Sequence, residues 1–223
     1  MSVDSIEPLD EFIAPPCEGE IEILYQDEHI LLIDKPSGLL SLSGKNPANL
    51  DSVHYRLTKD FPSALLVHRL DFGTSGIMLV ALSKDVVRRL NQQFSNREVR
   101  KTYEALLHGD VVADQGVLDY PISKGAFPRQ KVCYSTGKPA QSEYEVLARY
   151  NRSTRVRYKP LTGRTHQLRL HSHAFGHPIL GCDLYGTPES ERSAKRLLLH
   201  ASTLVFTHPV NAQEMSIEAP CPF

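Results

Sequence analysis

The sequence predicts a strand-rich fold with few helices. Short apolar runs recur along the chain between glycine, proline and small polar residues, a pattern typical of strands joined by turns. Only three segments, 52–59, 84–94 and 165–175, space their apolar residues as a helix does. The 223 residues are 41% hydrophobic and 23% charged, so the chain can bury a substantial core as one large domain or two small ones.

Residues 1–20 are predicted to lie outside that core, as a mobile leader or as a strap across the surface. They contain three prolines and many acidic residues, and such a composition buries little apolar surface. Strands are predicted at 21–25 and 30–33, joined by a short polar turn. The sequence Lys35-Pro36-Ser37-Gly38 then predicts a fixed loop from which Lys35 projects.

The middle of the chain is predicted to alternate strands with two helices. Asp51 is expected to cap the helix at 52–59, and Ser83 is expected to cap the amphipathic helix at 84–94. Further strands are predicted at 65–67, 77–82 and 100–107. The first two of these enclose a short polar segment, and loops held between buried strands often present catalytic groups.

The second half of the chain is predicted to contain a basic ribbon, a strand pair and a third helix. Residues 111–137 are rich in turns and carry lysine and arginine side chains that could grip a phosphate backbone. A strand pair turns around Asn151, and Thr165 is expected to cap a helix that ends before Gly176. The strands are expected at 138–146, 154–158, 202–207 and 214–218.

Charge is distributed unevenly along the chain. The net charge is −1, but residues 1–34 contain ten acidic residues and neither lysine nor arginine. The rest of the chain therefore carries 25 basic and 16 acidic residues, a net charge of +9. A basic body behind an acidic leader is consistent with a polyanionic partner, although a solvated surface of mixed charge gives similar totals.

The sequence lacks the signals of several other classes of protein. No apolar stretch approaches the roughly 18 residues of a membrane span, and no secretory signal is present. Four scattered cysteines without a C-x-x-C pair indicate free thiols of a cytosolic protein. His171 and His173 would point apart on a helix, and there is no H-E-x-x-H sequence, so we expect no metal site.

The most informative segment is Val67-His68-Arg69-Leu70-Asp71-Phe72-Gly73-Thr74-Ser75-Gly76. Asp71 is the only carboxylate between Asp60 and Asp85. An isolated aspartate in such a loop usually caps backbone amides. Taken as a whole, however, the pattern HRLD-x-x-TSG resembles the signature of the RluA family of pseudouridine synthases, in which the aspartate is the catalytic residue.

Four other segments match motifs of this family, in the same order along the chain. They are Lys35-Pro36-Ser37-Gly38-Leu39-Leu40, Lys101-Thr102-Tyr103, Gly163-Arg164-Thr165-His166-Gln167-Leu168-Arg169 and Leu197-Leu198-Leu199-His200-Ala201. The resemblance implies one α+β catalytic domain at residues 21–223, behind the acidic leader at 1–20. The sheet is expected to be mixed and mainly antiparallel, with flanking helices and an active-site cleft across its middle.

The resemblance also implies an activity, the isomerisation of uridine in RNA to pseudouridine, which is redox-neutral and needs no cofactor. Asp71 is the expected catalytic group, Arg169 is its cationic partner, and Tyr103 stacks on the base. Arg69 would fill the stack that the displaced uridine leaves, or else contact a phosphate. The expected RNA-binding set is completed by His68, which more readily supports the loop than transfers protons, and by Lys35, Arg164, His166 and Gln167. Leu70 and Leu199 are expected to give apolar support.

Within the family, the compact length and the segment 131–140 look most like the members that modify both 23S rRNA and tRNA anticodon loops. The expected partner is structured RNA, and we expect a cytoplasmic monomer that needs neither a membrane nor an obligate protein partner. A different rRNA or tRNA site is an alternative. A non-catalytic RNA-binding protein would also explain the charge distribution. An aspartate-nucleophile hydrolase could use the histidines of 166–177 as a base, although the loop lacks a hydrolase nucleophile elbow.

Overall fold

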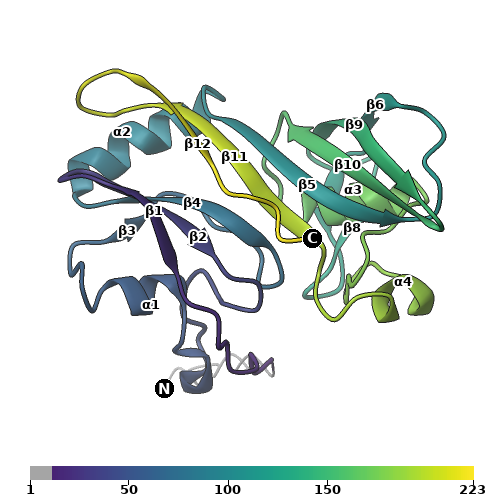
Figure 1. The fold of residues 1–223 in the computed structure, drawn as a ribbon, viewed down its shortest axis with the longest axis horizontal. Helices are drawn as coiled ribbons and strands as arrows, with labels where there is room; N and C mark the ends of the chain where they lie inside the picture. Colours follow the sequence, from purple (N-terminus) through teal and green to yellow (C-terminus); the bar gives the residue numbers. More distant parts are fainter. Residues whose placement is uncertain (1–11) are drawn as a thin grey trace, which may run out of the picture.

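A ten-stranded sheet runs through the whole molecule in the computed structural model, which describes residues 12–223 (Figure 1). Its strands are β1 (Glu22–Gln26), β2 (Ile30–Lys35), β3 (Leu65–Leu66), β4 (Ser75–Ala81), β5 (Arg100–His108), β6 (Gln115–Asp119), β9 (Gln141–Tyr150), β10 (Ser153–Pro160), β11 (Leu199–Thr207) and β12 (Glu214–Glu218). Their order is β1-β2-β4-β11-β5-β10-β9-β6, with β12 paired to β11 and β3 paired to β4. A separate ribbon is formed by β7 (Ile122–Lys124) and β8 (Gln130–Val132).

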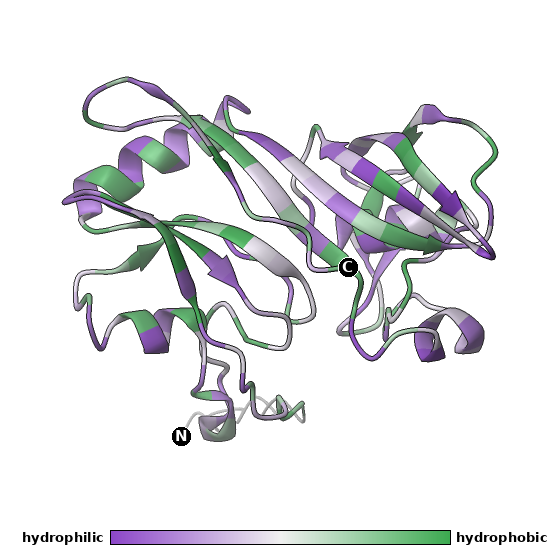
Figure 2. Cartoon of the chain, viewed as in Figure 1, coloured by the Kyte–Doolittle hydropathy of each residue, from purple (hydrophilic) through white to green (hydrophobic). Residues whose placement is uncertain are grey.

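The helices are few and short, as the sequence predicts. They are α1 (Val53–Leu57), α2 (Lys84–Ser95), α3 (Gln167–Ala174), α4 (Pro188–Arg192) and a 3-10 turn at Pro47–Asn49. The α2 helix is amphipathic, because Val86 and Leu90 are buried while charged residues such as Arg88 face solvent. Figure 2 shows the corresponding bands of hydrophobic and hydrophilic residues along this helix.

The described strand pairs are antiparallel except at one contact, where β4 meets β11 in parallel. There His200 and Ala201 of β11 lie opposite Ser75 and Gly76 of β4. Gly76 has a φ of +115°, and a Cβ atom at this position would lie 2.3 Å from the carbonyl oxygen of Ala201. Only glycine fits so close a backbone approach. The contact fixes the start of β4, and therefore the end of the loop that carries Asp71.

The hydrophobic core is divided by the sheet into separate clusters. One cluster lies between α2 and the β1–β4 half, another lies between α1 and the opposite face of those strands, and a third lies beneath α3 in the β9–β10 half. Tyr103 of β5 packs against two of these clusters. In Figure 1, β5 and β11 cross the centre and join the two halves, so the middle of the sheet is the place where both halves supply side chains.

The structure confirms the strand-rich, mainly antiparallel sheet with flanking helices and corrects two helix caps. Ser52, not Asp51, caps α1 by accepting a hydrogen bond from the amide of Tyr55. Asp51 instead pairs with Arg56 at 2.7 Å. Thr165 does not cap α3, because His166 occupies the cap position with a left-handed backbone and no side-chain cap bond. In both cases the helix begins one residue later than predicted, so the next residue along the chain occupies the N-cap position.

The leader prediction falls partly outside the described residues, which begin at Phe12. The part that is described lies across the surface. The ring of Phe12 packs edge-on against Phe72, with 5.5 Å between ring centres. Arg56 donates hydrogen bonds to the carbonyl oxygens of Cys17 and Gly19. Phe12 therefore contacts the loop that follows Asp71, whereas Cys17 and Gly19 are held by α1.

Candidate active site

A cleft of about 270 Å³ opens in the middle of the sheet. It is lined by the loop before β4, by β5, by the segment that leads from β10 into α3, and by the start of β11. Most of the residues predicted for the site line this cleft: His68, Arg69, Leu70, Asp71, Tyr103, Arg164, His166, Gln167, Arg169 and Leu199. Segments more than 100 residues apart in the sequence thus meet at one place.

Asp71 and Arg169 form the charged centre of the cleft. Asp71 lies in the loop between β3 and β4, and its side chain is 25% exposed. Arg169, on α3, is only 5% exposed, and its Nη1 lies 3.6 Å from Oδ2 of Asp71. The guanidinium is permanently charged, and its attraction for a nearby carboxylate is stronger in a buried position than in water. The fold therefore presents a carboxylate to the cleft with a fixed cation behind it.

Arg169 is itself held by two residues that the sequence analysis did not select. Its Nη2 donates to the carboxylate of Asp183. The guanidinium also lies over the ring of Tyr185, 5.5 Å from the ring centre. Both partners sit in the turn between α3 and α4, and nothing in their sequence spacing indicates contact with Arg169. The position of Arg169 depends on tertiary packing.

Tyr103 stands on β5 opposite Tyr158 of β10 and Ala201 of β11. Burial, together with the charge of Asp71, raises the pKa of its phenol far above the ordinary value. The hydroxyl therefore keeps its proton throughout the physiological range. Lys101 lies on the same face of β5, two residues earlier, and also lines the cleft. Lys101 belongs to the motif that contains Tyr103, and the alternation of the strand places both side chains on one face, although only Tyr103 was expected in the site.

His68 supports the loop. Its Nε2 accepts the amide hydrogen of Leu79 at 3.0 Å, and its ring stacks on Phe94 at 5.0 Å. An accepting Nε2 requires a neutral ring with its proton on Nδ1. Burial, helped by the positive charge of Lys101, lowers the pKa of His68 to about 4. His68 thus satisfies an amide of β4 at a residue that neither β3 nor β11 pairs with.

Lys35 corrects the prediction that this residue projects from its loop and binds RNA. The side chain is fully buried. Its Nζ donates to the carbonyl oxygens of Pro36, Leu39 and Phe72, at 2.8, 2.8 and 3.2 Å. These three acceptors match the three hydrogens of an ammonium group. Lys35 therefore joins the KPSG loop to the loop of Asp71 from inside, and the burial lowers its pKa to about 7.

Gln167 also has a different place from the one predicted. Its Oε1 accepts from Thr162 Oγ1 and from the amide of Arg164, and its Nε2 donates to the carbonyl of Gln141 and to Ser142 Oγ. All four hydrogen-bonding positions of the amide are used within the protein. Gln167 therefore shapes the wall of the cleft and leaves no position free for RNA.

The remaining predicted residues face the cleft in different ways. Nδ1 of His166 lies 2.8 Å from the hydroxyl of Tyr185, and burial lowers the pKa of this histidine. Arg164 is anchored by its Nε to the carbonyl of Pro139. Leu70 and Leu199 are buried and form apolar walls. Arg69 is exposed, and its side chain has no hydrogen bond or ion pair with any residue of the described chain.

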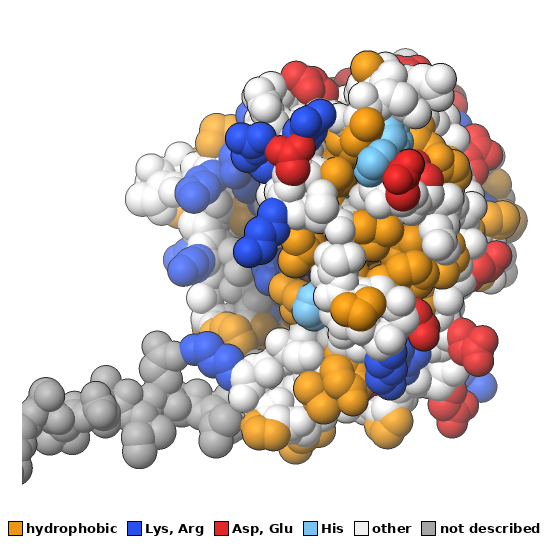
Figure 3. All heavy atoms as spheres, turned by 90° about the vertical axis from the view of Figure 1, so that its left-hand side faces the viewer, with side chains coloured by type: hydrophobic (Ala, Val, Ile, Leu, Met, Phe, Trp, Pro, Cys, Tyr) orange, Lys and Arg blue, Asp and Glu red, His pale blue; other side chains and the backbone are white. Residues whose placement is uncertain are grey.

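The described part of the chain contains no group of three or more His, Cys, Asp or Glu side chains that could hold a metal ion. Nor does any helix in residues 12–223 have the length and apolar character to cross a membrane. Lysine and arginine side chains gather toward one edge of the face drawn in Figure 3, beside a hollow, and most acidic side chains lie toward the opposite edge.

Comparisons with known proteins agree with this geometry. Residues 29–174 match a family model described as RNA pseudouridylate synthase. The dual-specificity RNA pseudouridine synthase RluA of Escherichia coli (strain K12) is 49% identical over 94% of this chain and 97% of that protein. The protein of the same name from Yersinia pestis is 52% identical over 84% of this chain and 92% of that protein. The solved structure of human RNA pseudouridylate synthase domain containing 1 has a TM-score of 0.78, with 29% identity, and covers 94% of this chain and 86% of that chain.

Proposed function

The chain belongs to the RNA pseudouridylate synthase family, and from that premise we propose which RNAs it modifies and how its cleft acts. It is an RNA pseudouridine synthase, built as an α+β domain of this family. Its substrates are uridines of 23S rRNA and of tRNA anticodon loops, and it acts as a cytoplasmic monomer without an obligate protein partner. The dual-specificity name of relatives matched over 94% of this chain supports two RNA targets.

The reaction explains why a carboxylate stands in the cleft. Pseudouridine forms when the N1–C1′ bond of uridine breaks, the base turns, and C5 of the base bonds to C1′. No electrons are gained or lost, so the reaction needs only a nucleophile or base, groups that keep water from the base, and groups that transfer protons. Asp71 is the nucleophile that adds to C1′ or to C6 of the base, or the base that takes the proton from C2′. In each route it acts as an anion, and the guanidinium of Arg169 lies 3.6 Å from its carboxylate.

Tyr103 stacks on the uracil ring and orients it for the proton transfer at C5. Two observations support this role. The ring lines the same cleft as Asp71, and its raised pKa keeps the hydroxyl protonated. A protonated phenol beside the base can donate a hydrogen bond that orients the ring, but it cannot accept the proton that leaves C5, so that proton passes to another acceptor.

Arg69 takes the place of the target uridine in its stack. Reaching the cleft requires the uridine to leave the RNA stack at a cost of a few kcal/mol. Arg69 is exposed at the cleft, two residues before Asp71, and its guanidinium has no partner within the described residues. A planar guanidinium can stack on the neighbouring bases and so offset part of the cost.

The approach of Arg169 to Asp71 beside Tyr103, in a cleft lined by apolar Leu70 and Leu199, is the observation that carries the proposal. The test uses unmodified 23S rRNA and unmodified tRNA transcripts, each labelled with tritium at C5 of uridine and incubated separately with the enzyme. Release of tritium from both, followed by mapping of the pseudouridine, supports the dual specificity. Release from one RNA alone would restrict the proposal to that class.

A further inference from the structure

A second cleft, which we call the side cleft, lies next to the catalytic cleft, and we propose that it binds the nucleotide adjacent to the target uridine. The side cleft has a volume of about 480 Å³ and lies between the residues around β8, the outer part of α3 and the turn at 184–186. The inference rests on the proposed function, because only a uridine in the catalytic cleft places its neighbour here.

The walls of the two clefts are in direct contact through one pair of side chains. Tyr185 lines the side cleft and His166 lines the catalytic cleft. The hydroxyl of Tyr185 accepts the amide hydrogen of Gln130 at 2.7 Å and lies 2.8 Å from Nδ1 of His166. Tyr185 therefore binds the ribbon on one side and the catalytic wall on the other. An RNA strand with one base in the catalytic cleft brings the next nucleotide to the side cleft.

The lining of the side cleft suits a nucleotide. Arg129 and Lys131 are exposed on it, and the side chains of both lack a hydrogen bond or ion pair within residues 12–223. None of the described residues that line this cleft carries a carboxylate. Val132 and Leu184, both half-buried, supply apolar surface beside these cations, and the buried Tyr185 lies behind it. Free cations next to an apolar wall are a combination that can hold a phosphate and the face of an unstacked base.

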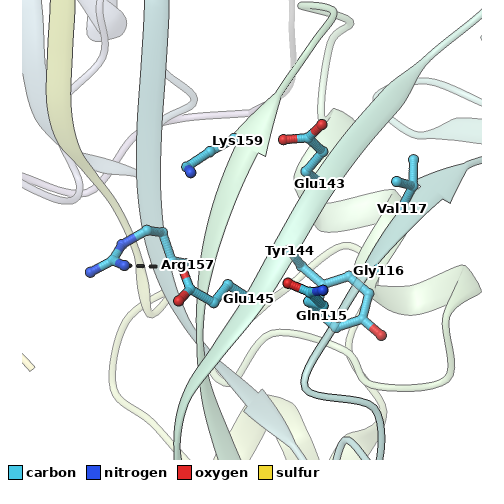
Figure 4. Close-up of a pocket in the computed structure, with 8 residues that line it drawn as sticks. All are labelled: Gln115, Gly116, Val117, Glu143, Tyr144, Glu145, Arg157 and Lys159. Atoms are coloured by element: carbon cyan, nitrogen blue, oxygen red, sulfur yellow. Dashed lines mark hydrogen bonds and ion pairs between the residues drawn. The ribbon is translucent and has the colours of Figure 1, made fainter.

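A third cleft shows that size and cations alone do not make such a site. It has a volume of about 450 Å³ and lies over β6, β9 and β10 (Figure 4). Arg157 and Lys159 line it, but so do Glu143 and Glu145, and Arg157 pairs with Glu145 at 3.1 Å. Carboxylates in these positions repel a phosphate. This third cleft, which we call the outer cleft, is therefore lined by one arginine and one lysine, as the side cleft is, but two glutamates cancel their positive charge.

The outer cleft provides a matched control for the experiment. The double variant Arg129→Gln with Lys131→Gln removes two positive charges from the side cleft, and Arg157→Gln with Lys159→Gln removes two from the outer cleft. A third variant, Ala174→Phe, fills the side cleft from the exposed end of α3 and keeps both cations. For each protein we would measure kcat and KM by tritium release, RNA affinity across a range of salt concentrations, and the melting curve.

We expect the Arg129/Lys131 variant to raise KM by about tenfold, since two exposed charge contacts each contribute under 1 kcal/mol. Its kcat should stay within about twofold, because Asp71 and Arg169 are unchanged. The slope of the logarithm of RNA affinity against the logarithm of salt concentration should become shallower by about 1.4, because two contacts to single-stranded RNA are lost. Ala174→Phe should raise KM similarly, whereas the outer-cleft variant should behave as the wild type does.

Equal effects of the two charge variants would overturn the inference, because they would reflect general attraction to RNA. An effect of the charge variant without an effect of Ala174→Phe would also overturn it, since the surface would then only guide the backbone. A wild type that releases no tritium from any RNA, but shows the predicted differences in affinity, would contradict the proposed function and would show that the side cleft binds RNA without a target uridine beside it.

Discussion

Replacing His68 by glutamine tests the position that the structure gives to this ring. In the folded chain Nε2 accepts the amide hydrogen of Leu79, and burial next to Lys101 lowers the pKa of His68 to about 4. In the unfolded chain the pKa of a histidine is about 6.5. Below that pH the unfolded state binds a proton that the folded state does not bind. The fold must therefore lose stability as the pH falls from about 6.5 toward about 4.

The magnitude follows from this difference in pKa. Between about pH 7.5 and about pH 4.5, proton binding by the unfolded state lowers the free energy of unfolding by about 2.5 kcal/mol. Because the ring is half-buried and keeps some contact with water, we expect about 2 kcal/mol after screening. Glutamine at this position keeps an oxygen for the amide of Leu79 but cannot bind the proton. The wild type should lose about 2 kcal/mol more than the variant over this interval.

Urea unfolding followed by circular dichroism measures this difference, since the chain contains no tryptophan. Both proteins are unfolded at each pH, and the change in the free energy of unfolding is compared between them. The comparison cancels the other titrating groups, which the two chains share. An equal loss of stability in both proteins would show that the ring takes up a proton as readily in the folded chain, and would refute its assignment as a neutral acceptor.

Three further substitutions test the supports of the cleft. Lys35→Met leaves the carbonyl oxygens of Pro36 and Leu39 without a donor. It should lower the free energy of unfolding, measured by chemical denaturation, by about 2–3 kcal/mol; removal of the buried charge, which is itself unfavourable, offsets part of the loss. An unchanged free energy of unfolding would contradict the buried position of Lys35. Gly76→Ala should cost about 3 kcal/mol or more, or prevent folding, because its Cβ would meet the backbone of Ala201 at 2.3 Å; a normal melting temperature would exclude that close approach. Arg69→Ala should keep the melting temperature and sharply reduce turnover of structured RNA, and full activity on that RNA would exclude the base-displacing role.

The alternation of apolar residues was sufficient to predict most of the sheet. The strand pair β9 and β10 turns near Asn151 as expected, and α2 begins after Ser83 as expected. These features depend on local pattern and on one capping side chain, both visible in the sequence. The pattern did not indicate the parallel pairing of β4 with β11, because a two-residue contact between distant segments leaves no periodic signal in the sequence.

Most of the family motifs lie in segments that line the cleft, but the motif at Lys35 does not, and the motifs did not indicate the direction of each side chain. Lys35 lies inside the protein because acceptors from two separate loops surround its ammonium group. The side-chain amide of Gln167 is similarly occupied by hydrogen bonds to β9 and to the turn before α3. Asp183 and Tyr185 lie in a turn with no motif, and only the packing of that turn on α3 brings them to Arg169. Burial and orientation of polar residues are properties of the tertiary structure.

The central claim is that Asp71 isomerises uridine in this cleft, and its most direct test is tritium release from C5-labelled unmodified RNA. Three proteins are compared: the wild type, Asp71→Asn, and Asp60→Asn as a control at an exposed aspartate outside the cleft. The variants lose one carboxylate each, so a general effect of charge on RNA binding is the same in both. We predict release by the wild type and by Asp60→Asn, and none by Asp71→Asn. Equal release by all three proteins would contradict the assignment of Asp71 as the catalytic residue.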